Sequence, residues 1–174
     1  MSELVSIFEL DAAAAPAAVD ELAAVLADCV NGGASVNFML PYAPADAAQF
    51  FKKVIPSIAR GETILLAAKV GGRIVGTVQL GLDTPPNQPH RAEVKKMLVH
   101  RAARGKGIGA ALLTHIEALA RQKGRTLLVL DTASDDARRL YERGGWQRLG
   151  NIPDYALLPD GALCDTTIYW KKLA

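Results

Sequence analysis

The segment Arg104-Gly105-Lys106-Gly107-Ile108-Gly109-Ala110 decides how the rest of this chain is interpreted. It follows an apparent strand that ends at Val99, and it opens an apolar run with helical periodicity. Glycines at alternate positions let backbone N–H groups approach an anion closely, and a helix start adds unpaired donors and the positive end of the helix dipole. The segment therefore predicts a turn that binds a phosphate compound.

Length and composition limit the kind of protein. The 174 residues, half of them hydrophobic, suit one globular domain, which we place at residues 1–174. A net charge of +2 gives no reason to expect a nucleic-acid or membrane partner. Six Lys/Arg residues nevertheless fall between Arg91 and Lys106, against the single acid Glu93, which suits a small polyanion near the glycine turn. Two distant cysteines and no leader-like or membrane-spanning run predict a cytoplasmic protein.

Apolar periodicity and turn signals divide the chain into strands and helices in the order β-α-α-β-β-β-α-β-α-β-β. This order predicts an α/β sandwich, with a mixed, mostly antiparallel sheet flanked by helices. Residues 151–161 are expected to form a loop rich in Pro, Asp and Gly, and Ile168–Trp170 an apolar edge for a homodimer. Strands are expected at 4–10, 63–70, 73–80, 92–99, 127–130, 146–149 and 166–172, and helices at 16–30, 44–59, 107–123 and 135–143.

Two well-known phosphate turns fit the segment poorly. A P-loop needs Ser or Thr after Gly-Lys to hold magnesium, but Gly107 follows Gly105-Lys106 here. A dinucleotide fingerprint is formally present, with Asp131 placed as the ribose acid. However, five residues separate Val99 from the first glycine, and only 64 residues remain after Ala110. An NAD(P) site is therefore disfavoured.

Several motifs together resemble the GNAT superfamily of acetyl-CoA-dependent N-acetyltransferases. Arg104-x-x-Gly107-x-Gly109 is similar to its R/Q-x-x-G-x-G/A signature, and the sequence LYERGGW at 140–146 is similar to its LYEKLGF segment. Residues 92–99 look like the family's central strand, and the run 90–169 is especially similar to tabtoxin-resistance-type acetyltransferases. The resemblance implies a GNAT-type fold with splayed central strands, acetyl-CoA as cosubstrate and no metal.

The resemblance also implies which residues hold the cosubstrate. Backbone groups of Met97, Leu98 and Val99 would pair with the pantetheine amides. Ser134 stands where many members have Asn, so its contact with pantetheine would be less rigid. The pyrophosphate would be held by N–H groups of Arg104, Gly105, Lys106, Gly107, Ile108, Gly109 and Ala110.

Three residues are candidates for the chemistry. Tyr141 matches the family tyrosine that hydrogen-bonds the CoA sulfur and protonates the leaving thiolate, the alternative being a core aromatic. Glu93 resembles in placement the general-base glutamate of histone-acetylating members, the alternative being an ion pair with Lys95 or Arg91. Asp131 is a candidate for positioning the amine or assisting proton transfer, or it simply begins a turn.

The acceptor is expected to lie against the two loops that bind substrates in the family. These loops hold the substrate-binding candidates Phe38, Tyr42, Asp154 and Tyr155, an aromatic and acidic set that suits a small cationic or zwitterionic amine. The function expected is direct transfer of an acetyl group to the primary amine of a small amino-acid-like molecule. A CoA-binding regulator without turnover, and a protein or peptide N-acetyltransferase, are the alternatives.

Overall fold

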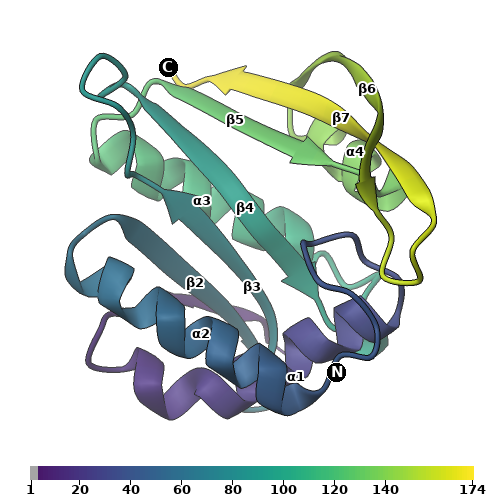
Figure 1. Cartoon of the computed structure of the whole chain (residues 1–174). Helices are drawn as coiled ribbons and strands as arrows, with labels where there is room; N and C mark the ends of the chain where they lie inside the picture. The colour runs from purple at the N-terminus through teal and green to yellow at the C-terminus, as the bar shows by residue number, and fades with distance from the viewer. Residues whose placement is uncertain (1–3) are drawn as a thin grey trace.

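The computed structural model describes residues 4–174, and these form one seven-stranded mixed sheet flanked by four helices (Figure 1). The order of elements along the chain is the predicted one, and the fold class is confirmed. The strands are β1 (Ser6–Glu9), β2 (Thr63–Val70), β3 (Arg73–Gly81), β4 (Arg91–Val99), β5 (Leu127–Thr132), β6 (Gln147–Leu157) and β7 (Leu163–Lys172). The helices are α1 (Ala15–Asn31), α2 (Pro44–Ala59), α3 (Ile108–Gln122) and α4 (Asp135–Arg143), with a 3-10 turn at Arg101–Ala103.

A hydrophobic core lies on each face of the sheet, because the central strands carry apolar side chains on both faces. Ile64 and Leu66 of β2 belong to the core that α3 covers. Leu65, between them, belongs to the core that α1 and α2 cover. Strands buried on both faces have this nearly continuous apolar sequence. None of the helices within residues 4–174 combines the length and apolar character that crossing a bilayer requires.

The strand order is β1-β2-β3-β4-β5-β7-β6, and β4–β5 is the parallel pair in it. Its ladder holds three residue pairs, from Arg91 with Leu127 to Glu93 with Val129. Beyond Glu93 the two strands diverge (Figure 1), although β4 continues to Val99. The predicted splay of the central strands is therefore confirmed, and the edge of β4 that faces β5 lacks a strand partner there.

A β-bulge lies in β4 just after the divergence begins. Thr77 of β3 pairs with Leu98 while Gln79 pairs with Lys95, so β4 has one residue more than β3 between these pairs. Lys96 lies in this insertion with a φ of +53°, a value that residues other than glycine seldom adopt. Lys95 lies on the same face of β4 as Glu93 by the alternation of a strand, and the bulge brings Lys96 to this side as well, so that both lysines line one cavity.

Two predictions about the last strands are wrong. Residues 151–157 are part of β6 and not of a loop, since β6 runs to Leu157 and a short turn joins it to β7. The strand carrying Ile168–Trp170 is not a sheet edge, because β7 lies between β5 and β6. Tyr169 is fully buried there, and the edge strand is β6.

Candidate active site

The glycine turn is open around its first two glycines. Gly105 and Gly107 have φ of +77° and +75°, and a Cβ added at either would meet no heavy atom within 4 Å. Backbone conformation, not crowding, therefore requires glycine at both positions. Gly109 differs, because a Cβ there would lie 3.2 Å from Leu140 Cδ2. It allows the first turn of α3 to pack against α4.

The same turn presents a row of unused backbone donors. The N–H of Arg104 already donates to the carbonyl of Arg101 at 3.3 Å. Among the hydrogen bonds within residues 4–174, none comes from an N–H group of 105–110. The first N–H groups of a helix have no intrahelical acceptor, and α3 adds the positive end of its dipole. This donor set and the open space fit a pyrophosphate.

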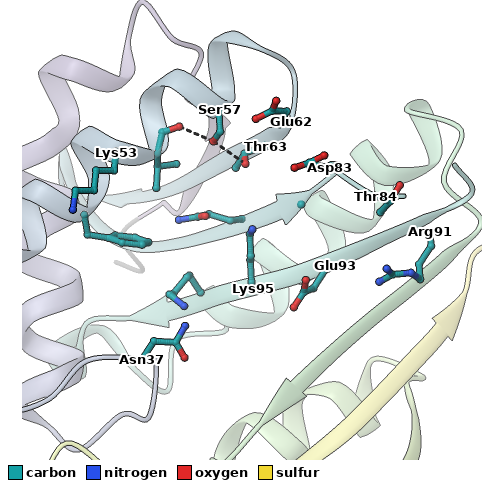
Figure 2. Close-up of a pocket in the computed structure, with 15 residues that line it drawn as sticks. Asn37, Lys53, Ser57, Glu62, Thr63, Asp83, Thr84, Arg91, Glu93 and Lys95 are labelled. Atoms are coloured by element: carbon teal, nitrogen blue, oxygen red, sulfur yellow. Dashed lines mark hydrogen bonds between the residues drawn. The ribbon is translucent and has the colours of Figure 1, made fainter. Parts of the chain in front are cut away.

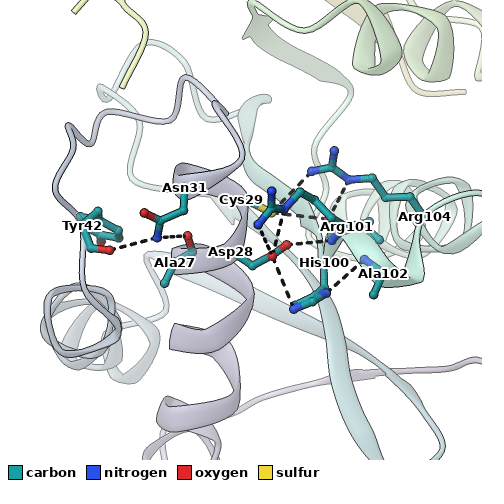
Figure 3. Close-up of polar contacts among 10 residues, drawn as sticks. Ala27, Asp28, Cys29, Asn31, Tyr42, His100, Arg101, Ala102 and Arg104 are labelled. Atoms are coloured by element: carbon teal, nitrogen blue, oxygen red, sulfur yellow. Dashed lines mark hydrogen bonds and ion pairs between the residues drawn. The ribbon is translucent and has the colours of Figure 1, made fainter. Parts of the chain in front are cut away.

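The Arg104 side chain turns back toward the end of β4. Its Nε donates to the Val99 carbonyl at 3.1 Å, and its Nη2 lies 3.8 Å from Cys29 Sγ (Figure 3). Cys29 in turn donates to the same carbonyl at 3.4 Å. Burial raises the pKa of the Cys29 thiol, so the group stays protonated beside Arg104. Arg104 thus fixes the turn to the strand that precedes it.

Asp28, near the end of α1, anchors the 3-10 turn that leads into the glycine segment. One carboxylate oxygen accepts from the backbone N–H of Arg101 at 2.8 Å, and the other lies 2.9 Å from the Arg101 guanidinium (Figure 3). Burial by itself would raise the pKa of Asp28, but the hydrogen bonds from Arg101, aided by the charge of His100, hold it below its usual value. This anchor was not predicted from the sequence.

Glu93 stands at the point where β4 and β5 part, and its side chain lines two cavities. Within residues 4–174 it forms no ion pair, so the alternative of pairing with Lys95 or Arg91 is not observed. Its side chain is exposed. A carboxylate in this position is free to accept a proton from a molecule bound in either cavity.

The smaller cavity, of about 220 Å³, brings Glu93 together with Asp131 and Tyr155. Asp131 belongs to β5, which continues to Thr132, and it accepts a hydrogen bond from Thr166 Oγ1 at 2.7 Å. Residues predicted from separate parts of the sequence thus meet at one place. Asp131 is held by β7, which suits positioning of a substrate group.

Tyr141 lies buried on α4, with its ring 5.7 Å from that of Trp146 and 5.9 Å from that of Tyr169. Burial, and then the charge of Asp131, raise the pKa of its phenol well above the ordinary value. The phenol therefore keeps its proton at neutral pH and is able to act as a hydrogen-bond donor or as an acid.

The larger cavity, of about 530 Å³, lies between α2 and the strands β3 and β4 (Figure 2). Its lining mixes charges of both signs. Lys53 and Lys95 contribute positive charge, and Glu62, Asp83 and Glu93 contribute negative charge (Figure 2). Sequence analysis missed most of this lining. The full set is Asn37, Phe50, Lys53, Val54, Ser57, Glu62, Thr63, Gln79, Gly81, Asp83, Thr84, Arg91, Glu93, Lys95 and Lys96.

The basic cluster noted in the sequence is divided by the fold. Arg91, Lys95 and Lys96 line the larger cavity, whereas Arg104 and Lys106 belong to the glycine turn. The fold therefore separates the positive charge beside the glycine turn from that in the larger cavity. Strand alternation puts Lys95 on the same face of β4 as Glu93, and the bulge adds Lys96 to the lining of this cavity.

The predicted substrate residues occupy different places. The Phe38 ring packs 4.8 Å from that of Tyr42 and 5.3 Å from that of Phe50, which lines the larger cavity. Within residues 4–174 the Tyr42 hydroxyl is buried without a hydrogen-bond partner, and burial, with the charge of Asp46, raises its pKa to about 12. Tyr155 lines the smaller cavity, whereas exposed Asp154 lines neither.

The loop before α2 and the turn between β6 and β7 touch one another, as the substrate-loop hypothesis requires. The N–H of Leu40 donates to the carbonyl of Pro159 at 2.9 Å, and Ser35 Oγ donates to the carbonyl of Leu157 at 3.2 Å. Ser134 caps α4 by accepting from the N–H of Ala137 at 3.3 Å. Residues 4–174 contain no cluster of three or more His, Cys, Asp or Glu placed to hold a metal ion.

Comparison with known proteins decides the family. The sequence model described as "Acetyltransferase (GNAT) family" matches residues 36–146, which include β4, the glycine turn and α4. The chain belongs to the GNAT acetyltransferase family. The predicted family is confirmed, while the narrower resemblance to tabtoxin-resistance-type enzymes stays a prediction.

Curated and solved relatives of this GNAT protein agree with that assignment. An IAA acetyltransferase of Azospirillum brasilense is 34% identical over 103 residues, which is 58% of this chain and 65% of the relative. The chain covers at most 65% of the length of the curated relatives compared.

Two solved structures share the fold at low identity. An N-acetyltransferase from Staphylococcus aureus Mu50 superposes with a TM-score of 0.81 at 19% identity, covering 98% of this chain and 99% of that one. A GNAT superfamily phosphinothricin acetyltransferase from Sinorhizobium meliloti, in complex with acetyl-CoA, superposes with a TM-score of 0.80 at 18% identity. This superposition covers 100% of this chain and 90% of that one.

Proposed function

We propose that this protein transfers an acetyl group from acetyl-CoA to the primary amine of a small amino-acid-like molecule. The observation that carries the proposal is the unused row of backbone donors at 105–110, which follows the part of β4 that β5 leaves unpaired. A solved relative with the same fold holds acetyl-CoA, and the family is one of acetyltransferases. The splayed edge of β4 then accepts the pantetheine arm beside Met97, Leu98 and Val99.

The reaction needs both substrates bound at once. The amine nitrogen attacks the thioester carbonyl carbon, the C–S bond breaks, and the sulfur leaves with the bonding electron pair. The attacking nitrogen must first lose a proton, because an alkyl ammonium has a pKa of about 10.4. Glu93 is placed to take this proton directly or through one water. Direct transfer requires no covalent bond to the protein.

Tyr141 is the proposed source of the proton that the departing CoA sulfur takes up. Its phenol is protonated because burial raises its pKa, so it can donate to the departing sulfur. Asp131, held by Thr166, is placed to orient the amine in the smaller cavity. The acceptor then reaches the thioester from the α2 side, through the larger cavity that shares Glu93.

Release of free thiol tests the proposal. The purified protein with acetyl-CoA is offered a panel of amino acids, diamines and peptides, and thiol is followed by a colorimetric reagent. We expect small amino-acid-like amines to accelerate release well above background hydrolysis. Binding of acetyl-CoA without acceleration by any amine would favour a regulatory CoA-binding protein, and acceleration by peptides alone would favour a peptide N-acetyltransferase.

A further inference from the structure

One buried polar side chain in the larger cavity lacks a partner. Gln79 is 3% exposed, yet its amide nitrogen has no hydrogen-bond acceptor within the described residues. Its side chain lines the cavity. A buried donor without an acceptor costs about 1–3 kcal/mol, so a ligand that supplies the acceptor is favoured at this position.

Two lysines line the same cavity as this donor. Lys95 is the β4 residue that pairs with Gln79, and its Nζ lies beside Gly81, 3.3 Å from a Cβ built there. Lys96 follows it in the bulge, with Nζ 5.9 Å from the ring centres of both Phe38 and Phe50. Within residues 4–174, neither lysine forms an ion pair.

The two lysines also repel one another. Burial, and then the charge of Lys95, lower the pKa of Lys96, although Asp131 and Glu93 act in the opposite direction. An anion between the two lysines would relieve this repulsion. Glycine at 81 keeps the space beside Lys95 Nζ open, because a larger side chain would meet it. The unpaired amide of Gln79 and the ammonium groups of two lysines without ion pairs therefore line one cavity within the described residues.

The acidic residue Glu93 lies two positions before Lys95 on the same strand, about 7 Å away at the backbone. The cavity thus has the Glu93 carboxylate, which suits an ammonium group, next to a site that suits an anion. A zwitterion matches both, whereas a diamine would place its second ammonium against the lysines.

We propose that Gln79, Lys95 and Lys96 form the subsite that binds the carboxylate of the acceptor, and so select amino acids over simple amines and diamines. This inference rests on the proposed function, and it names the residues that determine its specificity. The carboxylate would accept hydrogen bonds from the Gln79 amide and the two ammonium groups, while Glu93 faces the amine.

The test compares acids with their carboxamides. Glycine, β-alanine and 4-aminobutyrate are each assayed against the matching carboxamide, and the ratio of kcat/KM is measured. The wild type should prefer the acid that it uses best by at least about tenfold over its amide. Lys95→Met and Gln79→Leu should each reduce that ratio, Lys95→Met by about tenfold. Lys52→Met, which removes an exposed lysine of α2 outside the cavity lining, should leave it unchanged.

A negative charge introduced at nearly constant shape sharpens the result. Gln79→Glu should abolish the preference for the acid and improve the use of 1,4-diaminobutane. Thermal unfolding of each variant separates loss of selectivity from loss of the fold. Equal use of acid and amide by the wild type would overturn the inference, and so would unchanged ratios in both Lys95→Met and Gln79→Leu.

A binding measurement keeps this inference distinct from the proposed function. The CoA-loaded protein is titrated calorimetrically with N-acetylglycine and N-acetyl-β-alanine and with their carboxamides. Tighter binding of the acids that is lost in Lys95→Met supports the subsite even where no amine is acetylated, in which case the proposed function alone fails. Equal binding of acids and amides contradicts the subsite.

Discussion

Glu93 pairs with Val129 at the last rung of the parallel β4–β5 ladder, and the strands separate beyond this pair. The residue that ends the pairing also lines both cavities. A carboxylate therefore stands where the free edge of β4 begins, between the space beside β5 and the space under α2. This arrangement places a proton acceptor at the junction of the two substrate paths in the proposed ternary complex.

Gly107→Glu should weaken acetyl-CoA binding by at least about a hundredfold. The change puts a side chain and a negative charge where the pyrophosphate is expected, and it strains a backbone with φ of +75°. Gly72→Glu is the matched control, because Gly72 has φ of +79° and equally open space in the β2–β3 turn. Measured by calorimetry, Gly107→Glu should lose far more affinity for acetyl-CoA than Gly72→Glu. Equal losses of affinity in the two variants would show that backbone strain alone is responsible.

Tyr141→Phe should leave acetyl-CoA affinity nearly unchanged and lower kcat by roughly a hundredfold. The ring packing against Trp146 and Tyr169 is kept, but the donor to the leaving sulfur is lost. Because burial raises the pKa of Tyr141, the phenol keeps its proton up to about pH 9, and the substitution should not move the limbs of the pH–rate profile. Unchanged kcat would remove Tyr141 from the mechanism.

Glu93→Gln should lower kcat/KM by roughly a hundredfold or more and change the shape of the pH–rate profile, because the proton acceptor is lost. Glu62→Gln serves as the control, since Glu62 lines the larger cavity on its opposite side and is paired with Arg60 at 2.7 Å. Steady-state rates measured from about pH 6 to 9 test whether Glu93 accepts the proton of the amine. A pH–rate profile identical to that of the wild type would mean that water or the substrate itself accepts this proton.

Asp28→Ala should lower the midpoint of thermal unfolding by roughly 2–4 °C at pH 7. The pKa of Asp28 is depressed in the folded state, so its contribution is complete above the unfolded value of about 3.9 and is lost as the pH falls through the lower folded value. The difference between wild type and variant should therefore shrink below about pH 4. Asp20→Ala, at an exposed position of the same helix, should show no such dependence.

The sequence predicted those elements whose signals are local. Helix α2 has the bounds expected at 44–59, because Pro44 opens it and its apolar positions recur with helical spacing. The glycine turn was predicted because a backbone with positive φ favours glycine, and the sequence has glycine at the two positions that need it, Gly105 and Gly107. These features depend on a few neighbouring residues, so the sequence alone carries them.

Features that depend on pairing between strands were missed. Pro153 and Asp154 indicated a loop, but β6 is an edge strand with a register shift between Ile152 and Ala156. An edge strand tolerates Pro, and the shift accommodates Asp154 at a φ of +51°. The meeting of Gln79 with Lys95 likewise follows from the β3–β4 register and its bulge, which no local pattern records.

Thermal unfolding of the wild type with acetyl-CoA, CoA, NAD and ATP in parallel tests the central claim most directly. A ligand that binds only the folded state at a hundredfold excess over its Kd adds about 2.7 kcal/mol of stability. The glycine turn and the splayed strands predict a higher midpoint with acetyl-CoA and CoA and none with NAD. A shift with NAD, or no shift with either CoA compound, would contradict the account.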